Sequence, residues 1–294
     1  MEQKIFARTN KINYYLKIPP VNLLFERNNL ASRLQKEERF FQFWRQQNLS
    51  KIDYIRSLIT VASVSNNLSW IFFSAYQCAI RYHFKQKIRG TISLAVRENS
   101  DAPVKASFDN KKNILSLSGK KSWLVSTNVE MILLFVRLKK PIELPLNNST
   151  RLLKSILIPI YKEKSAIRKK FEKTRFLKNL NQGNLTLEHT QIFSKHISSG
   201  KKIRGFGASE QFFVMLSLAI YFVHKVKSPK LKRSFYVTVK ALILDFNARK
   251  PLKFLVKHHK KTLIKLINTF GQLPERKAII NWDTDKIIFK NMLK

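Results

Sequence analysis

The apolar residues of this chain change their spacing near residue 90, and this change constrains the fold more than any other feature of the sequence. Between residues 53 and 84 the apolar positions recur every three or four residues, as at Leu68 and Ile71, which predicts helices. Beyond residue 90 they alternate with polar residues, as at Ile92 and Leu94, which predicts strands. Later in the chain the helical spacing returns. Helices, then strands, then helices predict an α+β fold with segregated layers.

The same pattern divides the chain into three expected domains. They are an N-terminal helical domain (residues 1–90), a central β domain (91–198) and a C-terminal helical bundle (199–294). A chain of 294 residues, 44% of them hydrophobic, is long and apolar enough to bury a core.

Capping residues predict where several helices begin. We expect Ser50 to be an N-cap, with Asp53 in the first turn, where its charge meets the positive end of the helix dipole. We expect Asn66 and Asn67 to interrupt the helical segment that follows. Near the end of the chain, a helix should begin after Pro251.

Residues 115–128 carry the most distinctive pattern of the predicted β domain. Leucines alternate with serines up to Gly119, which supplies the backbone freedom of a tight turn, so we expect two short strands meeting at this glycine. Beyond the turn, Trp123 and Val125 fall on one face. Taken alone, the segment also fits a surface hairpin with a buried tryptophan.

Gly119, Lys121 and Trp123 form a Gly-x-Lys-x-Trp string. In this string the chain resembles the central β domain of the acyl-CoA dehydrogenase superfamily, in which Thr, Ser or Asn residues follow the aromatic residue and lie beside a flavin ring. Ser126 and Thr127 are the neighbouring hydroxyls here. An aromatic side chain offers the flavin a flat apolar face, and hydroxyls or amides can hydrogen-bond its polar edge.

Residues 96–101 resemble a shortened form of a second signature of this family, Thr-Glu-Pro followed by Gly-Ser-Asp. Glu98 and Ser100 stand at matching positions. The chain departs from the family at two threonines, which are replaced by Arg97 and, after the tryptophan, by Val125. The alternative interpretation of residues 96–101 is a solvated turn, since Asn, Ser and Asp form turns in many proteins.

The resemblance implies an FAD cofactor held by residues of both signatures. These are Glu98, Ser100, Trp123, Val125, Ser126 and Thr127. It also implies oxidation of an acyl thioester, in which a carboxylate removes the α-proton while the β-hydrogen leaves as hydride to the flavin. We nominate Glu210 as this base, ahead of Asp245 and Glu275. A carboxylate at Glu210 also suits the first turn of a helix on electrostatic grounds alone.

Other functions stay open. One is a catalytically degenerate relative of the same fold that acts as a binding protein, and another is nucleic-acid binding, because a net charge of +38 attracts polyanions. The lysines are spread along the whole chain, so a biased composition explains the charge equally well. The resemblance further implies a substrate carried by coenzyme A or a carrier protein, and a homo-oligomer.

Cys78 is the single cysteine, which excludes an intramolecular disulfide and fits a reducing compartment. Its neighbours at helical spacing are apolar, so we expect a buried, inert thiol. No signal peptide is recognisable, and the longest apolar run, residues 212–223, is shorter than a bilayer span. We therefore expect a cytoplasmic protein with no membrane span. The histidines form no metal-binding pattern, and we expect no metal.

Overall fold

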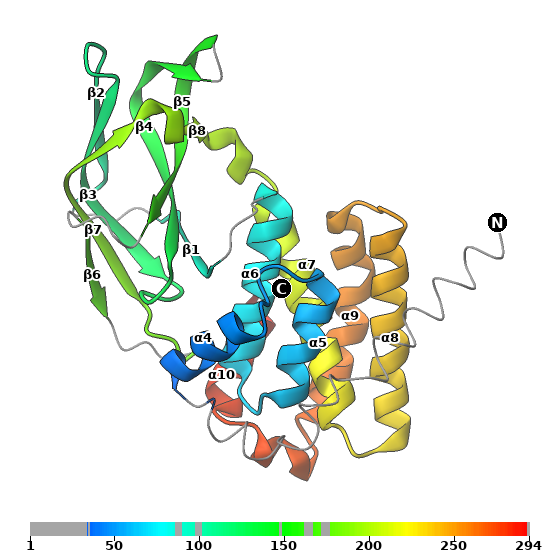
Figure 1. The fold of residues 1–294 in the computed structure, drawn as a ribbon. Coiled ribbons are helices and arrows are strands. Elements are labelled where there is room, and N and C mark those ends of the chain that lie inside the picture. Colours follow the sequence, from blue (N-terminus) through cyan, green and yellow to red (C-terminus); the bar gives the residue numbers. More distant parts are fainter. Residues whose placement is uncertain are drawn as a thin grey trace. The chain divides into compact units, whose positions relative to one another are not determined.

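The computed structural model describes residues 34, 36–85, 90–97, 102–146, 149–161, 167–171 and 177–292, and the structure is discussed for these residues. They belong to two compact units. The helical unit takes Met1–Arg89, Arg175–Asn179 and Phe206–Lys294, and the β unit takes Gly90–Thr174 and Leu180–Gly205. Figure 1 shows helices in one and sheets in the other, so the predicted α+β class is confirmed. The division into three domains at residues 90 and 198 stays a prediction.

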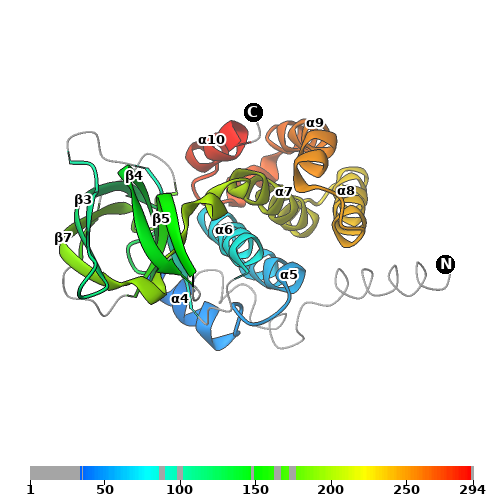
Figure 2. The same ribbon diagram turned by 90° about the horizontal axis from the view of Figure 1, so that it is seen from above.

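The helical unit is built around its most apolar helix. Its elements are α4 (Glu37–Gln46), α5 (Tyr54–Val64), α6 (Leu68–Phe84), α7 (Phe206–Lys225), α8 (Pro229–Asn247), α9 (Leu252–Phe270), the 3-10 helix η3 (Pro274–Ala278) and α10 (Trp282–Met292). Helix α7 packs against α5, α6, α8 and α9, which surround it in Figure 2. Every residue from Phe212 to Val223 is buried, so α7 forms the centre of the core, as expected of a helix that is apolar on all sides.

The same helix bears on the expectation that the chain has no membrane span. The segment Gly200–Lys225 is long and apolar enough to cross a membrane, but 78% of its most apolar window is buried inside the protein. A core helix of a globular unit has the same length and composition. Cys78 is buried on α6, as expected, and burial raises the pKa of its thiol to about 12.

Asp53, rather than Ser50, caps α5. The Oδ1 atom of Asp53 accepts hydrogen bonds from the backbone N–H groups of Ile55 at 2.9 Å and Arg56 at 3.2 Å. Ser50 lies three residues earlier, and its hydroxyl oxygen accepts a hydrogen bond of 2.7 Å from the indole N–H of Trp44. The predicted cap was wrong because a tertiary contact occupies the serine, while the aspartate is free to satisfy the first turn.

A buried carboxylate closes the start of α6. Asn67 caps this helix by accepting from the N–H of Ser69 at 2.9 Å, which confirms the predicted interruption. Asp285 of α10 is fully buried beside it, and accepts from the Ser69 hydroxyl at 2.9 Å and from the Leu177 N–H at 2.7 Å. Burial raises the pKa of Asp285 against the opposing effect of these hydrogen bonds. Asp285 therefore joins three segments of the helical unit that are distant in sequence.

The β unit consists of two four-stranded sheets. One has the order β1-β4-β5-β8, in which β1 pairs with β4 in parallel, and the other has the antiparallel order β2-β3-β7-β6. The strands are β1 (Ile92–Ala95), β2 (Lys105–Asp109), β3 (Ile114–Leu124), β4 (Met131–Leu146), β5 (Ser149–Tyr161), β6 (Ile167–Phe171), β7 (Gly183–Phe193) and β8 (Ser198–Ser199). The alternation predicted strands at Ile92 and at Leu115, and both residues lie in strands, in β1 and β3.

Gly119 lies inside strand β3 and does not end it, so the predicted turn between two short strands was wrong. The register against β7 shifts between Leu117 and Gly119, and Gly119 has φ +134°. A Cβ atom built on this glycine would lie 2.6 Å from the carbonyl oxygen of Pro103 and 2.7 Å from the Cα of Val104. Glycine is required here because another backbone segment passes too close for any side chain.

Substituting Gly119 by alanine should therefore lower the free energy of unfolding by about 2–4 kcal/mol, since both the backbone angle and the contact with Pro103 oppose a Cβ atom. Urea denaturation followed by circular dichroism measures the change. Gly207→Ala is the matched control, because a Cβ atom there has no neighbour within 4 Å. It should leave stability unchanged or raise it by up to about 1 kcal/mol, since Gly207 lies in a helix. Equal losses in the two variants would refute this explanation.

Candidate functional site

Trp123 sits at a second irregularity of β3, two residues beyond the buried Lys121. The register against β7 shifts between Lys121 and Leu124, and Trp123 has φ +64°, in the left-handed region. This conformation costs a residue with a side chain roughly 1–2 kcal/mol. The backbone N–H of Trp123 donates to the Oδ1 atom of Asn184 at 3.1 Å, which helps to hold it. The strained backbone re-aims the indole relative to a regular strand.

The indole itself is fixed at its polar edge. Its Nε1–H donates to the Oε1 atom of Gln182 at 2.8 Å, and Gln182 is completely buried. Trp123 is nevertheless 36% exposed, whereas Trp44, Trp70 and Trp282 are buried. The β unit therefore presents a flat aromatic ring that is both oriented and accessible, as a platform for a planar ligand must be.

Gln182 and Asn184 are functional candidates that the sequence alone does not reveal. They lie 59 and 61 residues beyond Trp123 in the chain. Strand β7 brings them to Trp123 because it pairs with β3 in antiparallel orientation. No pattern in the sequence around Gln182 and Asn184 specifies Trp123 as their partner.

The residues that follow Trp123 are turned inward. Val125 and Ser126 are 1% and 0% exposed. The Ser126 N–H donates to the Oγ atom of Ser93 at 3.2 Å, and the Ser93 hydroxyl donates back to the Ser126 carbonyl at 2.9 Å. The N–H of Thr127 donates to the carbonyl of Asn181 at 2.7 Å. The backbone donors of Ser126 and Thr127 are thus used within the β unit.

The hydroxyls of Ser126 and Thr127 differ in whether they are available to bond a ligand. The Ser126 hydroxyl oxygen accepts from the N–H of Asn128 at 3.1 Å and is buried. The Thr127 hydroxyl has no hydrogen-bond partner in the part of the chain that the structure describes, and Thr127 is 9% exposed. Thr127 is therefore the hydroxyl of this segment best able to bond a ligand. Glu98 and Ser100 lie outside the described residues.

Lys121 gives the Gly-x-Lys-x-Trp string an internal anchor. Its side chain is completely buried, with Nζ 3.3 Å from the carbonyl oxygen of Val96 and 5.9 Å from the ring centre of Phe135. A buried ammonium is costly unless such partners compensate for its lost hydration. The lysine of the string thus fixes the strand, while the tryptophan two residues later faces outward.

Glu210 belongs to the helical unit, near the start of α7, whereas Trp123, Val125, Ser126 and Thr127 come together in the β unit. The Glu210 carboxylate is half-buried and has no hydrogen-bond or ion-pair partner among the described residues. Burial raises its pKa from 4.5 to about 7. A carboxyl group with this pKa exchanges protons readily near neutral pH, as a general base must.

The other two candidate bases have different surroundings. Asp245 accepts a hydrogen bond of 2.6 Å from Lys250 and lies 3.0 Å from the Nε2 atom of His259. Burial alone would raise the pKa of Asp245, but these two partners outweigh it and lower the pKa. Asp245 therefore suits a link between α8 and α9. Glu275 lies in the 3-10 helix η3, where its charge falls in the first turn.

The chain has helices before and after a small two-sheet β unit in sequence order, and it matches solved structures of the acyl-CoA dehydrogenase fold, so the predicted resemblance is confirmed at the level of fold. Among similar solved structures, FMN-bound TdsC from Paenibacillus sp. A11-2 has a TM-score of 0.60 and 10% identity, over 96% of this chain and 90% of that one. Butyryl-CoA dehydrogenase from Megasphaera elsdenii has a TM-score of 0.57 and 9% identity, over 96% of both chains.

A third similar structure is nitrososynthase from Micromonospora carbonacea var. africana, with a TM-score of 0.56 and 9% identity over 95% of this chain and 93% of that one. No protein-family model matches the chain. No curated protein matches it either. At identities near 10%, these comparisons establish the fold and leave the activity to be argued from the site.

Removing the side-chain partner of the indole should loosen Trp123. We expect Gln182→Ala to increase quenching of tryptophan fluorescence by acrylamide and to shift the emission to longer wavelength, because Trp123 is the exposed tryptophan and loses its 2.8 Å bond. Trp123→Phe should remove most of the quenchable fluorescence, which would show that this fluorescence comes from Trp123. If acrylamide quenches the fluorescence of Gln182→Ala no more than that of the unmodified chain, Gln182 does not position the indole.

Proposed function

We propose that this chain is a flavin-dependent oxidoreductase and that the indole of Trp123 forms one wall of the flavin site. The observation that carries the proposal is the combination of strain, fixation and exposure at Trp123. Gln182 holds its indole, Asn184 holds its backbone N–H, and the residue is 36% exposed. Backbone strain and a fixed exposed aromatic ring are features that folding alone does not require. Butyryl-CoA dehydrogenase and FMN-bound TdsC, which have this fold, support the assignment by analogy.

The residues around Trp123 offer a flavin a surface for stacking but few hydrogen bonds for its polar edge. The indole can stack on a planar ring. Comparable aromatic stacking contributes about 1–3 kcal/mol to binding. For the polar edge, Thr127 offers its hydroxyl, since the backbone donors of Ser126 and Thr127 are used within the β unit. A bound flavin would supply hydride acceptance, and the chain would supply its orientation.

Loss of the aromatic wall should therefore weaken flavin binding. In a titration of the chain with FMN and FAD, followed by flavin fluorescence, Trp123→Ala should raise Kd about tenfold, whereas Trp123→Phe keeps a flat ring and should raise it less than threefold. The same titration decides between FAD, which we propose, and FMN. Binding that is unaffected by Trp123→Ala, or no binding of either flavin, would refute the proposed site.

For the substrate we propose an acyl thioester, carried by coenzyme A or by a carrier protein, with Glu210 as the base that takes the α-proton. Glu210 is half-buried and unpaired among the described residues, and its pKa of about 7 places half of the carboxyl groups in the basic form near neutral pH. Asp245 pairs with Lys250 and bonds to His259, and its pKa is lowered, which makes it the weaker candidate.

If Glu210 is the base, kcat/KM with a short acyl-CoA and a dye as electron acceptor should rise with pH and level off above about 7, because only the carboxylate accepts the proton. Glu210→Gln should lower kcat by about 10²-fold or more. Glu275→Gln, the same change at another candidate, should leave it unchanged.

A measurement of stability separates this role from a purely structural one. The folded-state pKa of Glu210 lies above its ordinary value of 4.5, so the fold favours the neutral acid and stability should fall as pH rises from about 4.5 to about 7. Glu210→Gln should remove that fall. A flat stability profile in the unmodified chain would contradict the raised pKa, and full activity of Glu210→Gln would contradict the catalytic role.

A second candidate function is a binding protein of this fold that has lost the chemistry. It is favoured by one observation: where the family places a threonine after the tryptophan, this chain has Val125, which is 1% exposed. The flavin titration distinguishes the two functions. We keep the cytoplasm as the proposed location and self-association as a proposal by analogy with the fold.

A further inference from the structure

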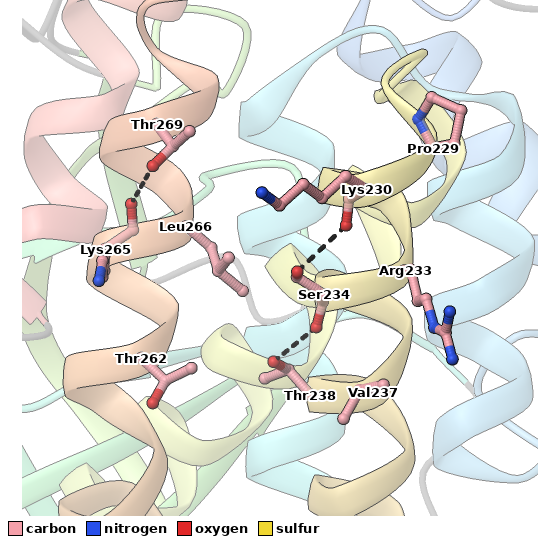
Figure 3. A pocket seen from close by; sticks show the side chains of 10 residues that line it. All are labelled: Pro229, Lys230, Arg233, Ser234, Val237, Thr238, Thr262, Lys265, Leu266 and Thr269. Atoms are coloured by element: carbon pink, nitrogen blue, oxygen red, sulfur yellow. Dashed lines mark hydrogen bonds between the residues drawn. The ribbon is translucent and has the colours of Figure 1, made fainter.

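A groove runs between α8 and α9 on the surface of the helical unit, with a volume of about 1050 Å³ (Figure 3). Cationic side chains line it from both helices, namely Lys230 and Arg233 on α8 and Lys265 on α9. Val237 and Leu266 supply aliphatic surface. In Figure 3, Lys230 and Leu266 extend into the space between the helices, whereas the guanidinium of Arg233 points away from α9.

Small side chains open the groove, and most of their hydroxyls bond within their own helix. Ser234 and Thr238 lie between the two helices, and their hydroxyls donate to the carbonyls of Lys230 and Ser234 at 3.1 and 2.9 Å. Thr269 likewise donates to the carbonyl of Lys265 at 3.0 Å. The hydroxyl hydrogens of Ser234, Thr238 and Thr269 are thus used within each helix, so the cations and the Thr262 hydroxyl are the groups that can attract an occupant.

The charge of the two helices is strongly one-sided. Their basic residues are Lys230, Lys232, Arg233, Lys240, Lys253, Lys257, Lys260, Lys261 and Lys265. Asp245 is their single acidic residue, and it is paired with Lys250 and His259. An occupant of the groove must therefore be acidic, and a second copy of this chain would bring like charges together.

The shape and the apolar surface narrow the choice further. The lining residues from Lys230 to Thr238 span roughly 12 Å of α8 at 1.5 Å per residue, about two turns of a facing helix. Val237 is 58% exposed and leaves aliphatic surface open in the lining of the groove. Nucleic acid is a poor match, because no aromatic ring lines the groove for base stacking.

We infer that the α8–α9 groove docks an acidic, amphipathic helix of a partner protein. Apolar residues one turn apart on that helix would contact Val237 and Leu266, and carboxylates flanking them would face Lys230 and Lys265. This is helix-in-groove recognition with electrostatic steering. The inference stands on the helical unit alone and does not depend on flavin binding.

The test uses the full chain and a fluorescein-labelled 18-residue synthetic peptide, with leucines at positions i, i+3, i+4 and i+7 and glutamates elsewhere. Its anisotropy should report saturable binding. A scrambled peptide of identical composition is the first control, and should bind at least tenfold more weakly because its leucines share no face. Lys230→Glu combined with Lys265→Glu should weaken binding at least tenfold, and Val237→Asp should also weaken it.

Lys253→Glu combined with Lys257→Glu is the matched control, since it makes the same charge change on exposed residues outside the groove. It should weaken binding less than threefold. The inference is overturned if both charge-reversed pairs weaken binding equally, or if the scrambled peptide binds as well. It is also overturned if an RNA oligonucleotide displaces the peptide from the unmodified chain and no longer binds the variant that combines Lys230→Glu with Lys265→Glu. Light scattering that shows dimers dissociated by that variant would assign the groove to a second copy instead.

Discussion

The candidate site depends on the hydrogen bonds by which Gln182 and Asn184 hold Trp123. The left-handed backbone of Trp123 costs roughly 1–2 kcal/mol, and each of the two bonds returns about 1 kcal/mol. The conformation is thus supported locally, and pairing of β3 with β7 keeps the donors and acceptors in register. An indole held this way has lost its mobility before a ligand arrives, which lowers the entropic cost of stacking.

The helical unit separates its core from its charge. Helix α7 carries no charged residue from Phe212 to Val223 and is buried there, while α8 and α9 place their lysines on the outside. Where a carboxylate is buried, as at Asp285, hydrogen bonds from Ser69 and Leu177 satisfy it. Because the lysines of α8 and α9 lie on the outside, the consequences of the net charge of +38 concern partners.

Periodicity predicted the architecture because each pattern reflects a local geometric rule, which a single segment satisfies by itself. It failed at Gly119, where the reason for the glycine is a backbone at Pro103 that no local pattern reveals. The capping prediction failed at Ser50 because the Trp44 indole competes for the hydroxyl. The Gly-x-Lys-x-Trp string located Trp123, but its supports at Gln182 and Asn184 and the raised pKa of Glu210 arise from tertiary packing.

The environment of Val125 determines what kind of flavin site this chain could have. A buried valine contributes roughly 1.5–3 kcal/mol to the core of the β unit, and it offers no hydrogen bond to a ligand. The backbone N–H and carbonyl of Ser126 are likewise hydrogen-bonded to the hydroxyl of Ser93. Val125 and Ser126 thus contribute to stability at positions from which the resemblance implies polar contacts with the flavin. Such a trade-off between stability and function is common. On the proposed function, stacking on Trp123 would supply most of the affinity, so the flavin would exchange with solution more readily than a cofactor held at both its face and its edge.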